Sequence, residues 1–212
     1  ENLTGGSGDD RLTGDGGANV LDGGAGDDTL SGGAGTDVLQ GGAGVDWASY
    51  GDASGGVVVS LGSPYAQNTL GAGTDTLVAI ENLEGSGFDD RLTGNAGSNV
   101  LVGGSGHDTL SGGGGGDLLY GGLGDDVYLL GSAGDVADEG GGDGHDRVET
   151  GFAHVLGAGV EDLTLTGYGA VSGTGNALDN RIVGTAGANL LIGAEGDDTL
   201  DGGGGADTLD GG

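Results

Sequence analysis

A nine-residue period governs most of this chain. The stretch 5–49 divides into five consecutive nonapeptides, the stretch 85–129 into five more, and the stretch 175–210 into four. Position six of the period is Asp or Asn in all fourteen units, and position eight is Leu or Ile in twelve, with Ala48 and Tyr128 as the exceptions. Such a period is typical of repeat architectures, in which each unit packs only on its neighbours.

Each unit reads as a short strand and a tight turn. In the unit 23–31, GGAGDDTLS, alternation places Leu30 on the opposite side of the strand from Thr29 and Ser31. The glycines at its start supply the positive φ angles that reverse a chain. Two units therefore make one coil, and units two apart stack about 4.8 Å from one another. We expect an all-β fold of parallel β-roll (β-solenoid) segments with leucines inside and no helix, because the glycine content opposes helix formation.

A longer period of 80 residues overlies the short one. Glu1-Asn2-Leu3, Glu81-Asn82-Leu83 and Glu161-Asp162-Leu163 recur at this spacing, each ahead of a repeat block. Between the blocks, β-forming residues predict strands at 57–61, 76–80 and 160–166. The expected organisation is elongated and has five parts, namely a first block with a lead-in strand at 1–49, a strand-rich insert at 50–84, a second block at 85–129, a second insert at 130–174 and a truncated third block at 175–212.

Aromatic residues close two of the blocks. Trp47, Tyr50 and Tyr128 stand where the leucine pattern stops. We expect them to cover the open ends of the roll segments, and we favour this role over ligand binding.

The composition excludes several classes of protein. Of the 212 residues, 59 are glycine, 34 are acidic and only four are basic, which gives a formal net charge of −30. A single proline excludes collagen. Nucleic acids and anionic membrane surfaces bind basic surfaces, which this chain lacks. No apolar run has the length of a membrane span, and a chain without cysteine has no disulfides.

The apolar core of such a roll is thin, since each nine-residue unit buries one leucine. Stacked turns also bring the position-six carboxylates close together, where they repel one another. A bound cation reverses the sign of that interaction. Ca²⁺ takes six to eight oxygen ligands, including carboxylates and backbone carbonyls, and the short side chain of Asp fits a tight turn better than that of Glu. These considerations favour calcium as the cofactor.

The units, GGAGDDTLS above all, resemble the RTX family of calcium-binding nonapeptide repeats, whose pattern is G-G-x-G-x-D-L-x-x or a frame shift of it. The resemblance covers the fourteen units, about 60% of the chain. It implies that one turn supplies the backbone oxygens of positions two and four and its position-six side chain. The turn two units on supplies the backbone oxygens of positions one and three and its own position-six side chain. About eight ions are expected, and Asp28 is shared between two of them.

The ligands that the resemblance implies fall in all three blocks. In the first block they are Gly6, Gly8, Asp10, Asp15, Gly17, Asn19, Gly23, Gly24, Ala25, Gly26, Asp28, Gly32, Ala34, Asp37, Gly41, Ala43 and Asp46. In the second block they are Ser86, Phe88, Asp90, Asn95, Gly97, Asn99, Gly103, Gly104, Ser105, Gly106, Asp108, Gly112, Gly114, Asp117, Gly121, Leu123 and Asp126. In the third block they are Thr185, Gly187, Asn189, Gly193, Glu195, Asp198, Gly202, Gly204 and Asp207.

Some units depart from the pattern. Asn replaces Asp at position six in four of them, which removes one negative charge from each site but keeps an oxygen donor: Asn19, Asn99, Asn180 and Asn189. The pair Asn180 and Asp198 also has Leu178 where position four is normally Gly, so we expect this site to be the weakest. The acids at position five are expected to face solvent, and these are Asp9, Asp27, Asp89, Asp125 and Asp197.

No catalytic motif is present. The chain has no G-x-S-x-G, no H-E-x-x-H and no phosphate-binding loop, and it has neither cysteine nor lysine. His145 with Asp143 and Asp146 could form a metal or acid–base cluster, but short polar turns often collect such residues. We therefore expect this segment to have no enzymatic activity.

The resemblance implies a secreted bacterial protein that leaves the cell by type I secretion and folds outside it on binding calcium. We expect a structural region of a surface-layer, adhesin or filament protein, with copies of itself as possible partners and no nucleic acid or membrane span. The alternative is the calcium-binding accessory region of a secreted hydrolase or polysaccharide-modifying enzyme, whose catalytic domain would be encoded elsewhere in the full protein.

Overall fold

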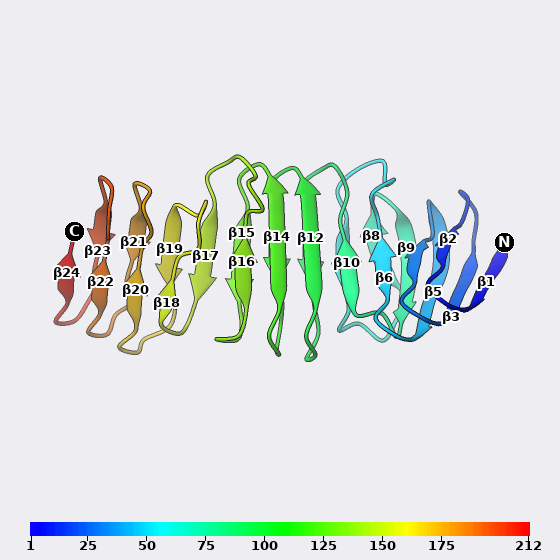
Figure 1. Ribbon diagram of the computed structural model, residues 1–212, viewed down its shortest axis with the longest axis horizontal. Coiled ribbons are helices and arrows are strands. Elements are labelled where there is room, and N and C mark those ends of the chain that lie inside the picture. The colour runs from blue at the N-terminus through cyan, green and yellow to red at the C-terminus, as the bar shows by residue number, and fades with distance from the viewer.

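The computed structural model describes residues 1–212 and contains 24 strands and no helix. The strands stand side by side along a rod, with the two termini at opposite ends (Figure 1). The chain winds as a flat spiral whose successive strands alternate between two faces of the rod, with one interruption described below. The predicted all-β, elongated, parallel β-roll is therefore confirmed. No helix with the length and apolarity of a membrane span is found.

One face of the rod carries two sheets that follow one another. The five-stranded sheet contains, in spatial order, β1 (Asn2–Ser7), β3 (Val20–Ala25), β5 (Gly35–Ala43), β9 (Gly73–Val78) and β8 (Gln67–Leu70). The eight-stranded sheet contains β7 (Val58–Ser60), β11 (Arg91–Thr93), β13 (Thr109–Ser111), β15 (Val127–Leu130), β17 (Arg147–Thr150), β19 (Asp162–Leu165), β21 (Arg181–Val183) and β23 (Thr199–Asp201). An antiparallel bridge between Val57 and Leu70 joins the two sheets.

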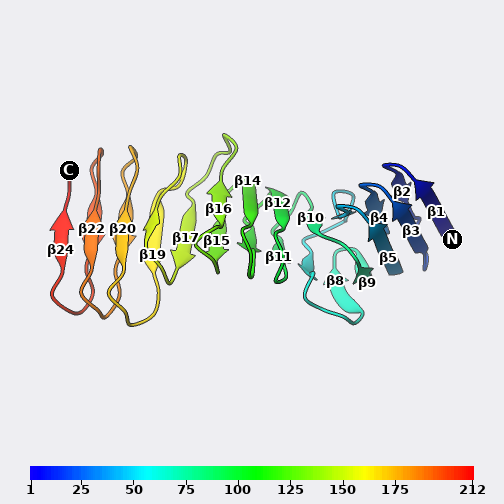
Figure 2. The same ribbon diagram turned by 60° about the horizontal axis from the view of Figure 1, so that its bottom comes forward.

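The opposite face also carries two sheets, which Figure 2 shows from a second direction. The seven-stranded sheet contains β2 (Arg11–Thr13), β4 (Thr29–Ser31), β6 (Trp47–Ser49), β10 (Asn82–Glu84), β12 (Val100–Ser105), β14 (Leu118–Leu123) and β16 (Val136–Asp138). The four-stranded sheet contains β18 (His154–Val155), β20 (Ser172–Thr174), β22 (Leu190–Ile192) and β24 (Thr208–Asp210).

The register of the sheets follows the repeat. Leu101 pairs with Leu83 on one side and with Leu119 on the other, each 18 residues away. Two nonapeptides thus make one coil, and residues at the same position of the repeat stack on one another. All strand pairs are parallel except β8 with β9.

The strands expected between the repeat blocks are present as β7, β9 and β19, but the chain reaches the first two in an unexpected order. After β6 it runs ahead to β7, returns through the antiparallel β8, and only then places β9 beside β5. Leu70, with a φ of 58°, stands at the reversal between β8 and β9. The strand β10 then pairs with β6, so the stack on the opposite face continues without interruption.

The expectation that aromatic residues cap the roll is wrong, because the roll does not end where they stand. Trp47 pairs with Asn82 of the next coil. Tyr128 occupies position eight of the inner ladder, fully buried, and its strand lies between β13 and β17. Tyr50 is buried in the same core.

The core is a ladder of position-eight side chains from the two faces, which meet inside the spiral. Eleven of these side chains are fully buried, and they are Leu21, Leu30, Leu39, Ala48, Leu92, Leu101, Leu110, Leu119, Tyr128, Ile182 and Leu191. Three fully buried residues from outside the repeat blocks continue the ladder, and they are Leu83, Val148 and Leu163. Each contacts the equivalent residue one coil above and below, so the apolar core runs continuously through both segments between the repeat blocks.

Substitution of two neighbouring leucines on β14 tests which side chains form the inner ladder. Leu119 is 0% exposed and points inward, whereas Leu118 is 40% exposed and points outward. We expect Leu119→Ala to lower the free energy of unfolding by about 2–5 kcal/mol, because it leaves a cavity in the ladder. We expect Leu118→Ala to change it by about 0.5 kcal/mol or less. Denaturant unfolding in saturating calcium measures both, and equal losses would contradict the inward orientation of Leu119.

Candidate metal centre

Nine of the ten repeat turns that end in Asp share one backbone conformation, with positive φ angles at positions two and four. In the turn 23–28, Gly24 and Gly26 have φ angles of 103° and 125° at positions two and four. The carbonyl oxygens of the preceding coil lie directly beside them, because a Cβ built on Gly26 would stand 2.5 Å from Gly8 O. Glycine adopts such positive φ angles without steric cost and fills these positions in all nine turns except at Ala194, whose φ is 87°. These turns therefore direct backbone carbonyl oxygens from one coil toward the next.

The position-six carboxylates of these turns form a column along each edge of the rod. Asp28 Oδ1 accepts a hydrogen bond from Asp10 N–H at 2.8 Å, and Asp46 Oδ1 accepts one from Asp28 N–H at 2.8 Å. Both residues of all eight expected pairs are brought together in this way. The other six pairs are Asn19 with Asp37, Asp90 with Asp108, Asn99 with Asp117, Asp108 with Asp126, Asn180 with Asp198 and Asn189 with Asp207.

The second oxygen of these carboxylates has no partner. Seven Oδ2 atoms are buried without a hydrogen bond, and they belong to Asp28, Asp37, Asp46, Asp108, Asp117, Asp126 and Asp198. A buried anionic oxygen without a partner is costly, so such atoms indicate an absent ligand.

Backbone oxygens converge on the same space. A Cβ built on Gly5 would stand 2.5 Å from Asp10 Oδ2 and 2.6 Å from Gly23 O, the carbonyl of the next coil. The same arrangement recurs at Gly23, whose Cβ would meet Asp28 Oδ2 and Gly41 O. A donor set made only of carboxylate and carbonyl oxygens suits a hard divalent cation such as Ca²⁺ or Mg²⁺.

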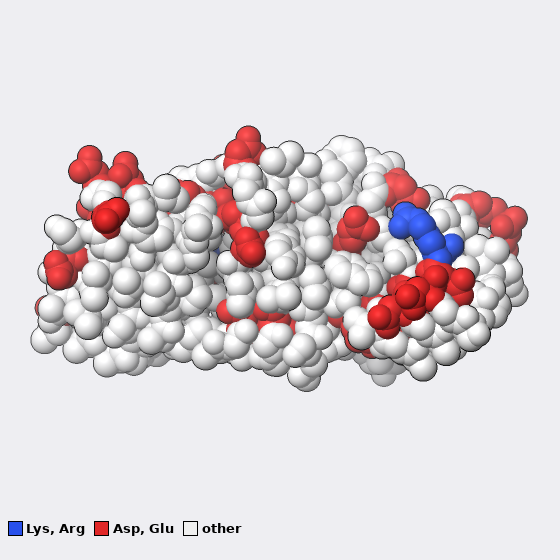
Figure 3. Space-filling model, viewed as in Figure 1, with Lys and Arg blue, Asp and Glu red and all other residues white.

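The electrostatics of the columns support the same conclusion. Burial, followed by the charges of neighbouring carboxylates, raises the pKa of Asp108 to about 7 and that of Asp126 to about 6. Burial likewise raises the pKa of Asp37, Asp46 and Asp117. Figure 3 shows acidic side chains along the whole length of one face and basic atoms at only one place on it. The protein therefore has few cations of its own to neutralise these columns.

Turns that end in Asn are built differently. Asn19 Oδ1 accepts a hydrogen bond from Asp15 N–H at 2.7 Å, and Asp15 Oδ1 accepts one from Gly17 N–H at 2.8 Å. Asn99 Oδ1 accepts one from Asn95 N–H at 2.8 Å in the same way. No residue in the turns 14–19, 94–99, 175–180 and 184–189 has a positive φ angle. In these turns the protein itself supplies partners to the oxygens of both side chains.

One further repeat turn lacks positive φ angles, as the Asn turns do, although it ends in Asp. Asp90 accepts hydrogen bonds from both the N–H and the Oγ–H of Ser86, and Phe88 N–H donates to Ser86 Oγ at 3.2 Å. The turn 85–90 also lacks positive φ angles. The expected ligands of this turn therefore lie in a conformation other than that of the glycine-rich Asp turns.

Five acids that the repeat analysis did not select continue the columns. Asp37 N–H donates to Asp75 Oδ1, and Asp117 N–H donates to Asp135 Oδ1, both at 3.2 Å. The other three acceptors are Glu81, Asp146 and Glu161, which accept N–H groups from Asp46, Asp126 and Asp146 at 2.8 Å. A signal was available, because each of these acids precedes an inward-facing residue by two positions, as position six does in the repeat.

The position-five acids are exposed, as predicted. They nevertheless form an outer ladder, because Asp9 Oδ1 accepts a hydrogen bond from Asp27 N–H at 2.9 Å and Asp27 Oδ1 accepts one from Val45 N–H at 2.8 Å. His107 takes the same role, with Nδ1 accepting from Asp125 N–H at 2.8 Å. This side chain therefore has a structural partner along the rod.

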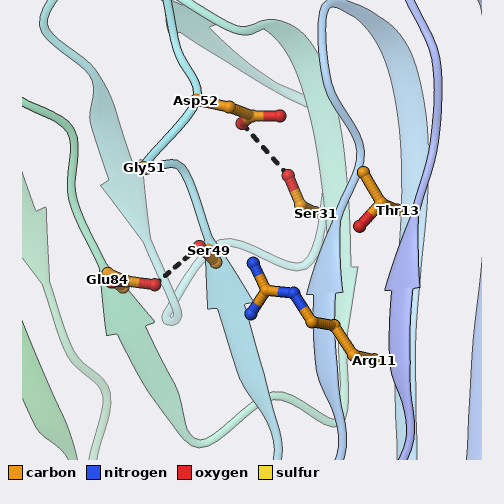
Figure 4. A pocket seen from close by; sticks show the side chains of 7 residues that line it. All are labelled: Arg11, Thr13, Ser31, Ser49, Gly51, Asp52 and Glu84. Carbon is orange, nitrogen blue, oxygen red and sulfur yellow. Dashed lines mark hydrogen bonds between the residues drawn. The ribbon is translucent and has the colours of Figure 1, made fainter.

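A polar hollow of about 360 Å³ lies over β2, β4, β6 and β10 (Figure 4). Ser31 Oγ donates a hydrogen bond to Asp52 at 3.1 Å, and Ser49 Oγ donates one to Glu84 at 2.6 Å. Arg11 and Thr13 complete its polar rim, and no histidine lines it. The serines face carboxylates without an imidazole to relay a proton, so the hollow does not assemble a hydrolase triad.

Comparison with known proteins agrees with the geometry. The model of the RTX calcium-binding nonapeptide repeat matches residues 1–30, 22–52, 80–110, 93–128, 102–137 and 174–212. These spans cover more than half of the chain. A search of curated proteins finds no match. The match and the stacked Asp turns together show that the chain belongs to the RTX calcium-binding nonapeptide repeat family.

Proposed function

We propose that calcium ions bind between the stacked Asp turns and that these ions hold the rod folded. The seven buried Oδ2 atoms without a partner carry this proposal. A carbonyl oxygen of the adjoining coil converges on the same place at four of them, namely Asp28, Asp46, Asp108 and Asp198. Most of the seven also have a second carboxylate as a neighbour in their column. A cation at these places satisfies the orphaned oxygens and turns the repulsion within the column into attraction.

The sites should differ in strength. The pairs Asp28 with Asp46 and Asp108 with Asp126 combine two carboxylates with two glycine-rich turns of positive φ. The pairs that contain Asn offer one charge fewer, and their Asn oxygens already accept a hydrogen bond within their own turn. We therefore place the tighter repeat sites at the Asp pairs and the weaker ones at the Asn pairs.

Folding on calcium binding suits a protein that is exported before it folds. The formal charge of −30 disfavours a compact chain without cations. We infer that the chain is a structural region of a secreted protein that becomes rigid outside the cell, as part of a surface layer, adhesin or filament. The continuous core through all coils supports this role, because it makes one stiff rod from a short repeat.

The first test removes the ion. In a calcium-free buffer we expect the chain to be expanded and poor in β-structure, and millimolar calcium should restore the rod. Magnesium should fold it poorly, because Mg²⁺ requires oxygen ligands at about 2.0–2.1 Å whereas Ca²⁺ accepts about 2.3–2.6 Å. Circular dichroism and small-angle scattering across separate titrations of the two ions measure this. Native β-structure without any divalent ion would refute the proposed dependence.

Adjacent aspartates give a matched test of the ligand column. Asp28 is buried in the column, whereas Asp27 is exposed beside it. We expect Asp28→Asn to raise the calcium concentration at half-folding by roughly tenfold or more, because it removes a charged ligand shared by two ions. Asp27→Asn removes the same charge and should leave the midpoint within about twofold of the wild type. Equal midpoints for the two variants would place the ions elsewhere.

A lower pH should stabilise the folded chain when calcium is absent and should oppose calcium-dependent folding when it is present. Burial raises the folded-state pKa of Asp108 to about 7 and that of Asp126 to about 6, both above the ordinary range of an aspartate carboxyl. Without calcium, the folded state therefore holds protons that the unfolded chain releases, and its stability falls as the pH rises from about 4 to 7. With calcium, protons compete with the ion, so the calcium midpoint should rise as the pH falls. Circular dichroism at several pH values distinguishes the two slopes, and a metal-free chain that gains β-structure with rising pH would contradict the buried carboxylate columns.

A further inference from the structure

The turn between β16 and β17 departs from the repeat. Asp126 and Asp146 are neighbours in one column, since Asp126 N–H donates to Asp146 Oδ1 at 2.8 Å. They are separated by 20 residues, whereas Asp108 and Asp126 are separated by 18. The two extra residues widen the turn 139–146, which is the yellow-green loop that projects beyond its neighbours next to β16 in Figure 2.

Glu139 begins this wider turn and is directed into the rod. The residue is only 4% exposed, and both of its carboxylate oxygens are buried without a hydrogen-bond partner. Gly159 of a neighbouring turn covers it, because a Cβ built there would stand 3.0 Å from Glu139 Cβ. The Tyr128 hydroxyl adjoins this carboxylate, but it carries no charge. A glutamate buried in this way is costly unless a further group neutralises it.

Two further buried carboxylates face Glu139. Carboxylate oxygens of Asp126, Glu139 and Asp146 all lie within 4.8 Å of one another. Asp126 and Asp146 are 1% and 2% exposed, and Asp126 Oδ2 also lacks a partner. No basic side chain is among them, so three carboxyl groups share one dry space with no cation from the protein.

Either a proton or a metal ion can neutralise such a cluster. Burial, followed by the charges of Asp146 and Asp126, raises the pKa of Glu139. A single proton, however, supplies one hydrogen bond and leaves the other orphaned oxygens without partners. A divalent cation contacts all three carboxylates at once, and the adjoining turn 121–126 has the positive φ glycines of the other Asp turns.

We propose that Asp126, Glu139 and Asp146 form a calcium site with a third carboxylate that the repeat sites lack, and that this site binds calcium more tightly than they do. Calcium affinity in proteins rises with the charge of the ligands and the rigidity of the site. The inference rests on the proposed function in that it takes the cation to be calcium. The site lies in the middle part of the rod, where Asp126 closes the second repeat block and Glu139 and Asp146 lie outside the fourteen nonapeptides. It is the first site to fill as calcium rises.

Two isosteric variants of the same turn test the site. Glu139→Gln removes the buried charge, whereas Asp143→Asn removes one charge from an exposed side chain that makes no hydrogen bond. Calcium is titrated into each full-length chain against a competing fluorescent chelator, and circular dichroism follows folding in parallel. We expect Glu139→Gln to weaken the tightest class of site by at least about tenfold, as loss of supporting ligands does at metal sites. Asp143→Asn should match the wild type.

A second readout separates a ligand from a packing residue. Without calcium, Glu139→Gln should hold more β-structure than either the wild type or Asp143→Asn, because it removes an unpaired buried charge. An unchanged tightest class in Glu139→Gln, while the wild type binds calcium and folds, overturns this inference alone. A Glu139→Gln chain that folds at no calcium concentration also overturns it. A wild type that binds no calcium overturns both the inference and the proposed function.

Discussion

Along much of this rod a carboxylate of one coil stacks on a carboxylate of the next, and the rest of the structure depends on how that stack is neutralised. One oxygen of each carboxylate is satisfied by the backbone, as where Asp28 N–H donates to Asp46 Oδ1 at 2.8 Å. The other oxygen is left without a partner in seven turns. The core can offset little of this cost, since each coil buries only about two large apolar side chains. The thin core and the column of like charges are therefore linked, because under the proposed function bound cations contribute the stability that a globular protein obtains from its interior.

The rod contains two kinds of turn, which differ in how their oxygens find partners. Glycine-rich Asp turns adopt positive φ angles and direct carbonyl oxygens toward the next coil, and under the proposed function a cation binds there. Asn turns satisfy their own oxygens, as where Asp15 N–H donates to Asn19 Oδ1 at 2.7 Å. The side-chain oxygens of the Asn turns therefore have partners within the protein, whereas seven Oδ2 atoms of the Asp turns have none.

The repeat predicted much of this structure because stacking copies one local pattern many times. Position eight predicted the inner ladder, and position six predicted which acids meet across coils. The back-folding of β7, β8 and β9 could not be predicted, because it depends on which strand finds a free sheet edge. Tyr128 was misassigned as a cap because its ring replaces a leucine within the ladder, where only the stack of β13, β15 and β17 reveals its burial. Glu139 was missed because it follows no period and is brought to Asp126 by two extra residues in one turn.

Hydrogen bonds within the columns give a structural role to two of the glutamates that recur with the 80-residue period. Glu81 and Glu161 lie outside the nonapeptides but take the place of position six in their columns. Their Oε2 atoms accept N–H groups from Asp46 and Asp146 at 2.8 Å. The next residue in each column is an asparagine, and its Nδ2–H donates to the backbone oxygen of the glutamate, at 2.7 Å for Asn99 and 3.1 Å for Asn180. At these joints an amide group of the protein itself is the partner of the glutamate's backbone oxygen. Each Glu–Asn joint therefore ends one run of carboxylates and begins the next, which limits how much like charge accumulates in any continuous stretch of the rod.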